Sequence, residues 1–324
     1  MIPAQWNIYD TCAEEHLRLK YKNINGKIFV YLFILMTKKE ITMRIGVRGH
    51  DVEHSSLENL FENIHKQGFH CTQLALSKAV KEFKVNNGVM TPGLAFYIRE
   101  LCAENKVDVS VLGCYLNLAN PNKESLKKTQ DTYKAHIRFA SLAGAGMVGT
   151  ETGAVNEEYS FTPDNHTDEA LDVFVEGLRP VVEYAEKMGV IIAIEPVYKH
   201  IVCNFERARK VLDTINSPNL QLIFDPVNVI YAGNYEKQDE IIRTAFELCG
   251  NDICCMHLKD FVVEDGVVKS VISGRGLLNY PLLMSYVKTY KPYVHCLLED
   301  TKPDNAAEAK KFVEEQYEKA ALLN

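Results

Sequence analysis

The sequence predicts a single α/β domain, a closed (β/α)8 barrel of the TIM type that begins at Met43 and follows an N-terminal extension. Short runs of Val, Ile, Leu, Phe, Cys and Met, too short for helices, indicate strands buried on both faces, as in a parallel sheet. Stretches with apolar residues at helical spacing alternate with these runs. The last four runs recur roughly every thirty to forty residues, about one strand–helix unit of such a barrel.

The first half of the barrel is predicted from regular alternation after Met43. The predicted strands cover residues 43–51, 70–76, 108–118 and 147–153. The predicted helices cover residues 55–68, a segment opened by Thr91 and Pro92, residues 124–142 and residues 169–189. Ser55 and Glu58 match a capping box at the start of the first helix, and Pro92 is typical of a first helical position.

The second half repeats the pattern. Its predicted strands cover residues 190–197, 220–228, 253–260 and 294–300. Its predicted helices cover residues 205–215, 237–248, a segment that follows 274–280, and residues 305–323. Asn204 is the expected cap of the helix 205–215. Residues 261–271 are expected to form a hairpin with Asp265 and Gly266 in its turn.

Composition limits the classes of function. The 324 residues are 47% apolar, enough for one large core, and the net charge of −7 argues against a nucleic-acid binder that relies on a basic face. Nine cysteines, several of them inside apolar strands and with no CxxC pair at zinc spacing, indicate reduced thiols in a cytoplasmic protein. We therefore expect no nucleic-acid partner and no membrane partner.

Residues 1–42 are predicted to form the N-terminal extension. Basic residues precede the apolar run 28–36, which is too short to span a bilayer. This order resembles a secretory signal, but no small-residue cleavage site follows. An appendage packed on the barrel, a poorly ordered segment and a start codon upstream of the native one at Met43 remain open.

Four polar side chains stand at the ends of the last four predicted strands. They are Glu195, Asp225, His257 and Glu299. The carboxyl ends of the strands form the active-site face of barrels of this kind, so these groups are expected to converge there. Three carboxylates and one imidazole would repel one another without positive charge between them, and one divalent metal ion is the simplest source of it.

The motifs EPVYKH, FDPVN, MHLKDF and LLED, which contain these four residues, resemble the xylose-isomerase-like superfamily, and most of all its sugar phosphate isomerase/epimerase proteins. Members include ketose 3-epimerases, hydroxypyruvate isomerase, inosose dehydratase and endonuclease IV. The resemblance covers residues 43–324. It implies a cytoplasmic enzyme of carbohydrate metabolism with a small sugar or sugar phosphate as substrate, often a homo-oligomer.

The resemblance also implies roles for the four residues. Glu195, Asp225, His257 and Glu299 would hold one divalent ion, Mn²⁺ or else Mg²⁺, Co²⁺ or Zn²⁺. Glu195 and Glu299 would move a proton on and off the substrate through an enediolate, giving isomerisation or epimerisation. A lyase of the inosose dehydratase type and an endonuclease-IV-like phosphodiesterase are the alternatives. Asn228 and Ile201 stand where many ketose 3-epimerases have His and Glu, which weakens both the ordinary 3-epimerase and the nuclease readings.

Further side chains near the strand ends are candidates for substrate binding. These are Glu151, Lys199, His200, Asn228, Lys259, Arg275 and His50, with Arg48, Gln73 and Lys78 as secondary candidates. Arg275, between Gly274 and Gly276, is the best phosphate candidate because flexible backbone amides flank a guanidinium ahead of a helix. Each of these residues has an alternative role as a solvated loop residue. Lys259 has the further alternative of an ion pair with Asp260.

Overall fold

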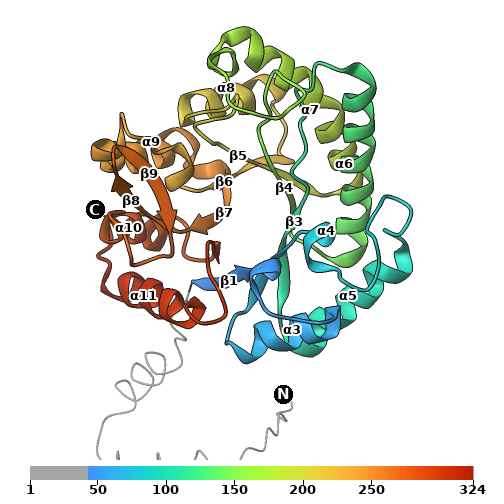
Figure 1. Ribbon diagram of the computed structural model, residues 1–324, viewed down its shortest axis with the longest axis horizontal. Helices are drawn as coiled ribbons and strands as arrows, with labels where there is room; N and C mark the ends of the chain where they lie inside the picture. Colours follow the sequence, from blue (N-terminus) through green and yellow to red (C-terminus); the bar gives the residue numbers. More distant parts are fainter. Residues whose placement is uncertain (1–42, 324) are drawn as a thin grey trace, which may run out of the picture. The chain divides into compact units, whose positions relative to one another are not determined.

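The predicted barrel is present in the computed structural model, which describes residues 43–323 (Figure 1). The N-terminal extension predicted for residues 1–42 lies outside the described residues. The barrel strands are β1 (Arg44–Arg48), β2 (Cys71–Leu74), β3 (Asp108–Gly113), β4 (Met147–Glu151), β5 (Ile191–Glu195), β6 (Leu220–Phe224), β7 (Ile253–Leu258) and β10 (His295–Leu298). All pair in parallel and close in the order β1-β10-β7-β6-β5-β4-β3-β2. The fold prediction is confirmed.

Helices surround the ring of strands. They are α3 (Leu57–Lys66), α4 (Leu76–Ala79), α5 (Pro92–Asn105), α6 (Lys123–Ala143), α7 (Asp168–Met188), α8 (Phe205–Ile215), α9 (Gln238–Cys249), α10 (Tyr280–Tyr290) and α11 (Ala306–Lys319). Side chains cap several helices, because their oxygens accept hydrogen bonds from backbone amides that have no partner within the helix. The Asn204 side chain caps α8, but Ser56, rather than the predicted Ser55, caps α3. No helix in the described part is long and apolar enough to cross a membrane.

Two apolar layers hold the barrel together. The outer layer packs between strands and helices and includes the fully buried Phe61, Phe139 and Phe174. The inner layer takes one side chain from each of seven strands: Cys71, Val111, Met147, Ala193, Ile223, Cys255 and Leu297. Four of these, Cys71, Val111, Ala193 and Cys255, are small or medium-sized, as a narrow, filled barrel interior requires. The cysteines of the described residues are free thiols, as predicted.

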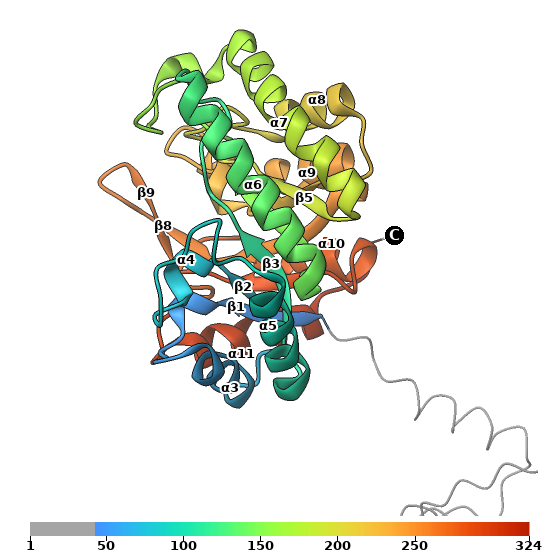
Figure 2. The ribbon, with the colours of Figure 1, turned by 90° about the vertical axis from the view of Figure 1, so that its right-hand side faces the viewer.

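The predicted hairpin after β7 is also present. Strands β8 (Asp260–Glu264) and β9 (Val267–Val271) pair antiparallel and project from the barrel (Figure 2). Asp265 and Gly266 both have positive φ angles, 50° and 73°, as a tight two-residue hairpin turn requires. Because the hairpin follows β7, it starts beside the carboxyl ends of the strands.

Candidate active site

The four predicted metal ligands lie at the carboxyl ends of neighbouring strands. Glu195 is the last residue of β5, Asp225 follows β6, His257 is the penultimate residue of β7, and Glu299 follows β10. All four side chains are buried, with exposed fractions between 0% and 7%. Parallel pairing in this region aligns the strand ends, so the residues meet at one edge of the barrel.

Distances among these side chains define a compact cluster. Glu195, Asp225 and His257 each offer one ligand atom, and the three atoms lie within 4.8 Å of one another. Nδ1 of His257 is 3.0 Å from Oε1 of Glu195 and 3.3 Å from Oε1 of Glu299. Oxygen and imidazole nitrogen donors at this spacing match the ligand preferences of Mn²⁺, Zn²⁺ and related ions. The residues present therefore fit a single divalent ion, with Glu299 beside the group of three.

Two basic side chains of the chain itself lie among these carboxylates. Lys259 Nζ is 2.8 Å from both Asp225 Oδ2 and Glu299 Oε2, and Arg48 Nη1 is 3.4 Å from Glu299 Oε1. Among the described residues, Lys259 is the partner of Asp225 Oδ2, through this buried ion pair. The alternative pairing of Lys259 with Asp260 is wrong, because the Asp260 carboxylate accepts three backbone amides instead. Positive charge in the cluster thus comes in part from the protein.

The electrostatic balance of the cluster sets its protonation. Burial alone would raise the pKa of Glu299, but Lys259, His257 and Arg48 outweigh burial and hold that pKa well below its usual range. Burial alone would lower the pKa of His257, but Glu195 and Glu299 outweigh it and raise the pKa to about 9. Glu299 is therefore ionised at neutral pH, which is the state required of a ligand or a proton acceptor.

A cavity of about 310 Å³ opens above the cluster and brings several further predicted residues together. Its lining includes Glu195, Glu299, Lys259, Asn228, Glu151, His50, Arg48, Gln73 and Lys78. Asn228 Nδ2 donates a 2.7 Å hydrogen bond to Glu195 Oε1. His200 lies just behind the wall, its Nδ1 3.6 Å from Glu151 Oε2. Burial, followed by the charges of Glu195 and Glu299, raises the pKa of Glu151 to about 7.

Lys199 and Arg275 do not line this cavity. Lys199 is exposed on the loop after β5, and its neighbour His200 does not line the cavity either but is largely buried beside Glu151. Arg275 is 59% exposed and pairs with Glu308 at 2.6 Å. Its flanking glycine Gly276 serves close packing, because an added Cβ would lie 2.2 Å from the carbonyl oxygen of Phe261. The prediction of a phosphate-binding turn here is therefore not supported by the position of the guanidinium.

Sequence reasoning missed two tyrosines of the cavity, Tyr115 and Tyr159. Tyr115 stands two residues beyond the end of β3, so the strand-end rule that identified Glu195 would have found it. Tyr159 lies in the loop between β4 and α7, and its ring stacks on His200 with centroids 5.0 Å apart. No pattern in that loop marks Tyr159 in the sequence.

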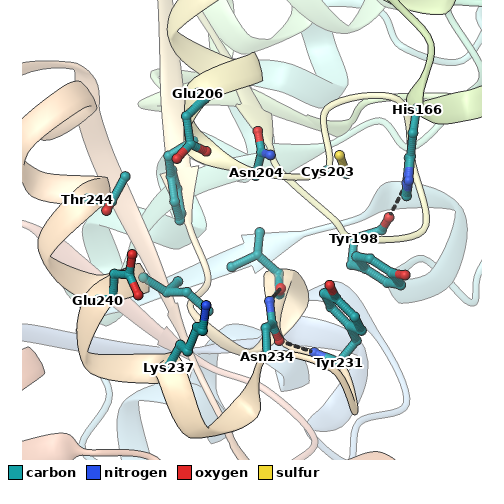
Figure 3. A pocket seen from close by; sticks show the side chains of 13 residues that line it. His166, Tyr198, Cys203, Asn204, Glu206, Tyr231, Asn234, Lys237, Glu240 and Thr244 are labelled. Atoms are coloured by element: carbon teal, nitrogen blue, oxygen red, sulfur yellow. Dashed lines mark hydrogen bonds between the residues drawn. The ribbon is translucent and has the colours of Figure 1, made fainter.

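A second cavity, of about 360 Å³, lies between the loops that precede α8 and α9 (Figure 3). The stacked rings of Tyr198 and Tyr231, 3.9 Å apart, form part of its wall. None of the predicted site residues lines it. It is larger than the first cavity, but the first holds the converging charged groups and is the better candidate for chemistry. A backbone hydrogen bond links a wall residue of the second cavity to one of the first: the amide of Tyr198 donates to the carbonyl oxygen of Asn228.

Comparison with known proteins places this geometry in a family. Residues 61–316 match the family model described as xylose isomerase-like TIM barrel. No curated protein matches this sequence.

Solved structures share the fold and include sugar epimerases. A D-tagatose 3-epimerase-like protein superposes with a TM-score of 0.68 at 21% identity, covering 85% of this chain and 97% of its own. The 3-keto-D-glucoside 4-epimerase YcjR from E. coli has a TM-score of 0.65 at 12% identity, with 85% and 100% covered. The IolI protein with a bound zinc atom has a TM-score of 0.65 at 18% identity, with 85% and 96% covered. At these identities the likeness concerns the fold, whereas the family model spans most of the sequence. The chain belongs to the xylose isomerase-like TIM barrel family.

Proposed function

We propose that the protein is a divalent-metal-dependent isomerase or epimerase of a small sugar. The observation that carries the proposal is the convergence of Glu195, Asp225 and His257 within 4.8 Å, with Glu299 beside them. Glu195 and Glu299 of this group line the 310 Å³ cavity. Membership of the xylose isomerase-like family and the epimerases among its structural neighbours support the same reading.

The proposed ligands are Glu195, Asp225, His257 and Glu299. A bound divalent ion would act as a Lewis acid that stabilises negative charge on the substrate oxygens when an adjacent C–H proton leaves. Its identity within the series Mn²⁺, Mg²⁺, Co²⁺ and Zn²⁺ is not distinguished by this donor set.

Glu195 and Glu299 are the proposed acid/base pair. They lie on β5 and β10, separated in the barrel by β6 and β7, so they approach a substrate in the cavity from different sides. Asn228 holds Glu195 in place through its 2.7 Å hydrogen bond. Lys259 and Arg48 keep Glu299 ionised. One carboxylate removes the proton and the other returns it, so the configuration or the carbonyl position changes.

Solvent exchange tests this proposal. Ketoses, ketose phosphates and inososes are incubated with the protein and Mn²⁺ in D₂O, and deuterium incorporation at carbon is read by NMR after removal of the metal. Glu195→Gln and Glu299→Gln are expected to abolish exchange, whereas Glu264→Gln on the exposed β8–β9 hairpin keeps it. Full exchange in both cavity variants, with intact folding, rules out the acid/base pair.

A lyase that expels a hydroxyl is the second candidate, and Glu151 is the observation that favours it. Glu151 pairs with Glu195 in the β4–β5 register, and its raised pKa of about 7 lets it hold a proton near neutral pH. A protonated carboxyl is the donor that a departing hydroxyl needs. Product analysis separates the two candidates, because a lyase yields water and a dehydrated carbonyl compound.

A further inference from the structure

Two residues of the first cavity have a backbone conformation that their local structure does not explain. In the described part of the chain, five residues other than glycine have a positive φ angle. Lys106 and Asn216 end the helices α5 and α8, and Asp265 lies in the hairpin turn, where this left-handed conformation is ordinary. Tyr159 and Asp300, at 52° and 56°, neither end a helix nor lie in a hairpin turn. Both line the first cavity, and strained backbone is concentrated at functional sites.

Side chains of the loop between β4 and α7 hold Tyr159 in this conformation. Asn156 bonds both backbone groups of Ser160, the next residue: its Oδ1 accepts from the amide at 2.9 Å, and its Nδ2 donates to the carbonyl oxygen at 3.0 Å. The buried Asn165 donates to the carbonyl oxygens of Ser160 and Lys199, at 3.3 and 3.0 Å. The stack on His200 orients the ring of Tyr159 itself. These contacts are all made within the chain, so the tyrosine is in place before a substrate arrives.

The hydroxyl of Tyr159 is buried and has no hydrogen-bond partner among the described residues. Burial, and after it the carboxylate of Glu151, raises the pKa of Tyr159 far above its usual range, so the hydroxyl is neutral and can donate. Buried polar groups in native proteins are nearly always paired, because an unpaired one costs free energy. An unpaired hydroxyl on a strained residue of a cavity wall therefore indicates a group that pairs with a ligand.

Tyr159 stands on the Glu195 side of the cavity. Its loop follows β4, and the β4–β5 register places Glu151 beside Glu195. Asp300, directly after Glu299, belongs to the opposite side, because three strands separate β4 from β10 in each direction around the ring. A substrate carbon within reach of the Glu195 carboxylate thus has the tyrosine hydroxyl on the same side.

We infer that Tyr159 is a catalytic residue: its hydroxyl donates a hydrogen bond to the substrate oxygen that becomes negative when Glu195 removes the neighbouring carbon-bound proton. The C–H bond breaks, its electron pair moves toward that oxygen, the proton goes to the Glu195 carboxylate, and the hydroxyl proton stays on the tyrosine. A donor fixed in advance contributes most where charge develops during the reaction. This inference rests on the proposed function, in which Glu195 is a proton acceptor.

The kinetics of deuterium exchange give the first test. Tyr159→Phe keeps the ring and the backbone and removes only the hydroxyl. We expect kcat for exchange on the Mn²⁺-loaded protein to fall about 10- to 100-fold, with KM changed less than about two-fold, since the bond strengthens as negative charge develops. The melting temperature of the free protein is expected to stay unchanged, because the hydroxyl has no partner there.

Tyr198→Phe is the matched control. Its ring lies on the neighbouring loop after β5 and forms part of the wall of the second cavity, outside the proposed site. We expect this variant to keep the kcat and KM of the wild type. A merely structural role for Tyr159 predicts a lower melting temperature for Tyr159→Phe with kcat unchanged, and that result overturns the inference.

Binding of glycolohydroxamate, a planar mimic of an enediolate, gives a second readout that needs no turnover. In isothermal titration calorimetry on the Mn²⁺-loaded protein, we expect Tyr159→Phe to bind this compound about ten-fold more weakly than the wild type and Tyr198→Phe. Equal affinities, or no binding to the wild type, overturn the inference even where the wild type exchanges deuterium. Affinity that depends on Tyr159 in a protein that exchanges no sugar supports the donor and contradicts the isomerase proposal.

Discussion

Nζ of Lys259 lies 2.8 Å from Oδ2 of Asp225, so an ammonium group of the protein neutralises one of the proposed metal ligands. The same ammonium is 2.8 Å from Glu299. Both contacts are buried, where charge interactions are strong and an unpaired charge is costly. Under the proposed ligand set, a divalent ion would compete with Lys259 for the same carboxylates, and the lysine would stabilise the cluster in the metal-free protein.

Replacing Lys259 by methionine is the first test of this competition. The variant keeps the length of the side chain but leaves Asp225 and Glu299 without their ammonium partner. We expect a loss of about 3 kcal/mol in the free energy of unfolding in EDTA, since removing one partner of a buried pair costs about 3–5 kcal/mol. Added Mn²⁺ is expected to restore more stability to the variant than it adds to the wild type. Urea unfolding with and without Mn²⁺ measures both.

Lys269→Met provides the control for that experiment. Lys269 also pairs with a carboxylate, that of Glu264, but on the exposed hairpin, with 56% of its side chain in solvent. An exposed pair contributes about 0–1 kcal/mol, so this variant is expected to behave as the wild type does. Equal responses of Lys259→Met and the wild type to Mn²⁺ contradict the competition.

Asn228 is expected to act as a positioning residue for Glu195. Its Nδ2 donates a 2.7 Å hydrogen bond to Glu195 Oε1, and without it that carboxylate loses one of its two close contacts. We expect Asn228→Ala to lower the deuterium-exchange kcat about ten-fold with little change in KM, the effect of about 1.4 kcal/mol on the proton-transfer step. Asn219→Ala, which removes a bond to the Val190 carbonyl, is the control. A raised KM with unchanged kcat would indicate that Asn228 binds substrate instead.

Stability of the metal-free protein is expected to fall as pH rises from 5 to 8 because of Glu151. Burial and two neighbouring carboxylates raise its pKa from 4.5 to about 7 in the folded state. Between these values the folded state holds a proton that the unfolded state has lost, so stability is complete below about pH 4.5, declines as pH rises from there to about 7, and levels off above that. The side chain is 33% exposed, so solvent screening reduces the loss to on the order of 1–2 kcal/mol.

Glu151→Gln isolates that contribution. The glutamine has no carboxyl to ionise, so the variant is expected to lose about 1–2 kcal/mol less than the wild type between pH 5 and pH 8. Unfolding free energies from urea titrations in EDTA give the comparison, and Glu247→Gln, at an exposed position on α9, is the control. Identical pH profiles for Glu151→Gln and the wild type would show that Glu151 titrates at its ordinary pKa.

The barrel and the proposed ligand set could be predicted because both follow from periodicity. A buried strand gives a short apolar run, and the residue that ends it, such as Glu195 or Asp225, is placed by the parallel register alone. The ion pairs between side chains of different strands cannot be predicted from periodicity. Which carboxylate Lys259 contacts depends on side-chain packing between β7, β6 and β10, which no local pattern records. Tyr115, two residues beyond the end of β3, is accessible to the same strand-end rule.

The segment Gly274–Arg275–Gly276 shows how one motif can support two physical explanations. In the sequence, glycines beside an arginine ahead of a helix indicate an anion site. In the structure, the guanidinium contacts Glu308, and Gly276 lies against the carbonyl of Phe261. Glycine serves close backbone approach as readily as it serves anion binding, so the sequence alone cannot distinguish the two.

Paired substitutions at this segment decide between the explanations. Arg275→Ala removes an ion pair whose partners are 59% and 55% exposed, so it is expected to change the free energy of unfolding by less than about 1 kcal/mol and to leave substrate affinity unchanged. Gly276→Ala places a Cβ 2.2 Å from the Phe261 carbonyl oxygen, and the strand or the loop must move. We expect a loss of about 1–3 kcal/mol in urea unfolding, as for other overpacked sites. If Gly276→Ala is neutral and Arg275→Ala weakens binding of ketose phosphates alone, the segment binds phosphate and the packing explanation is wrong.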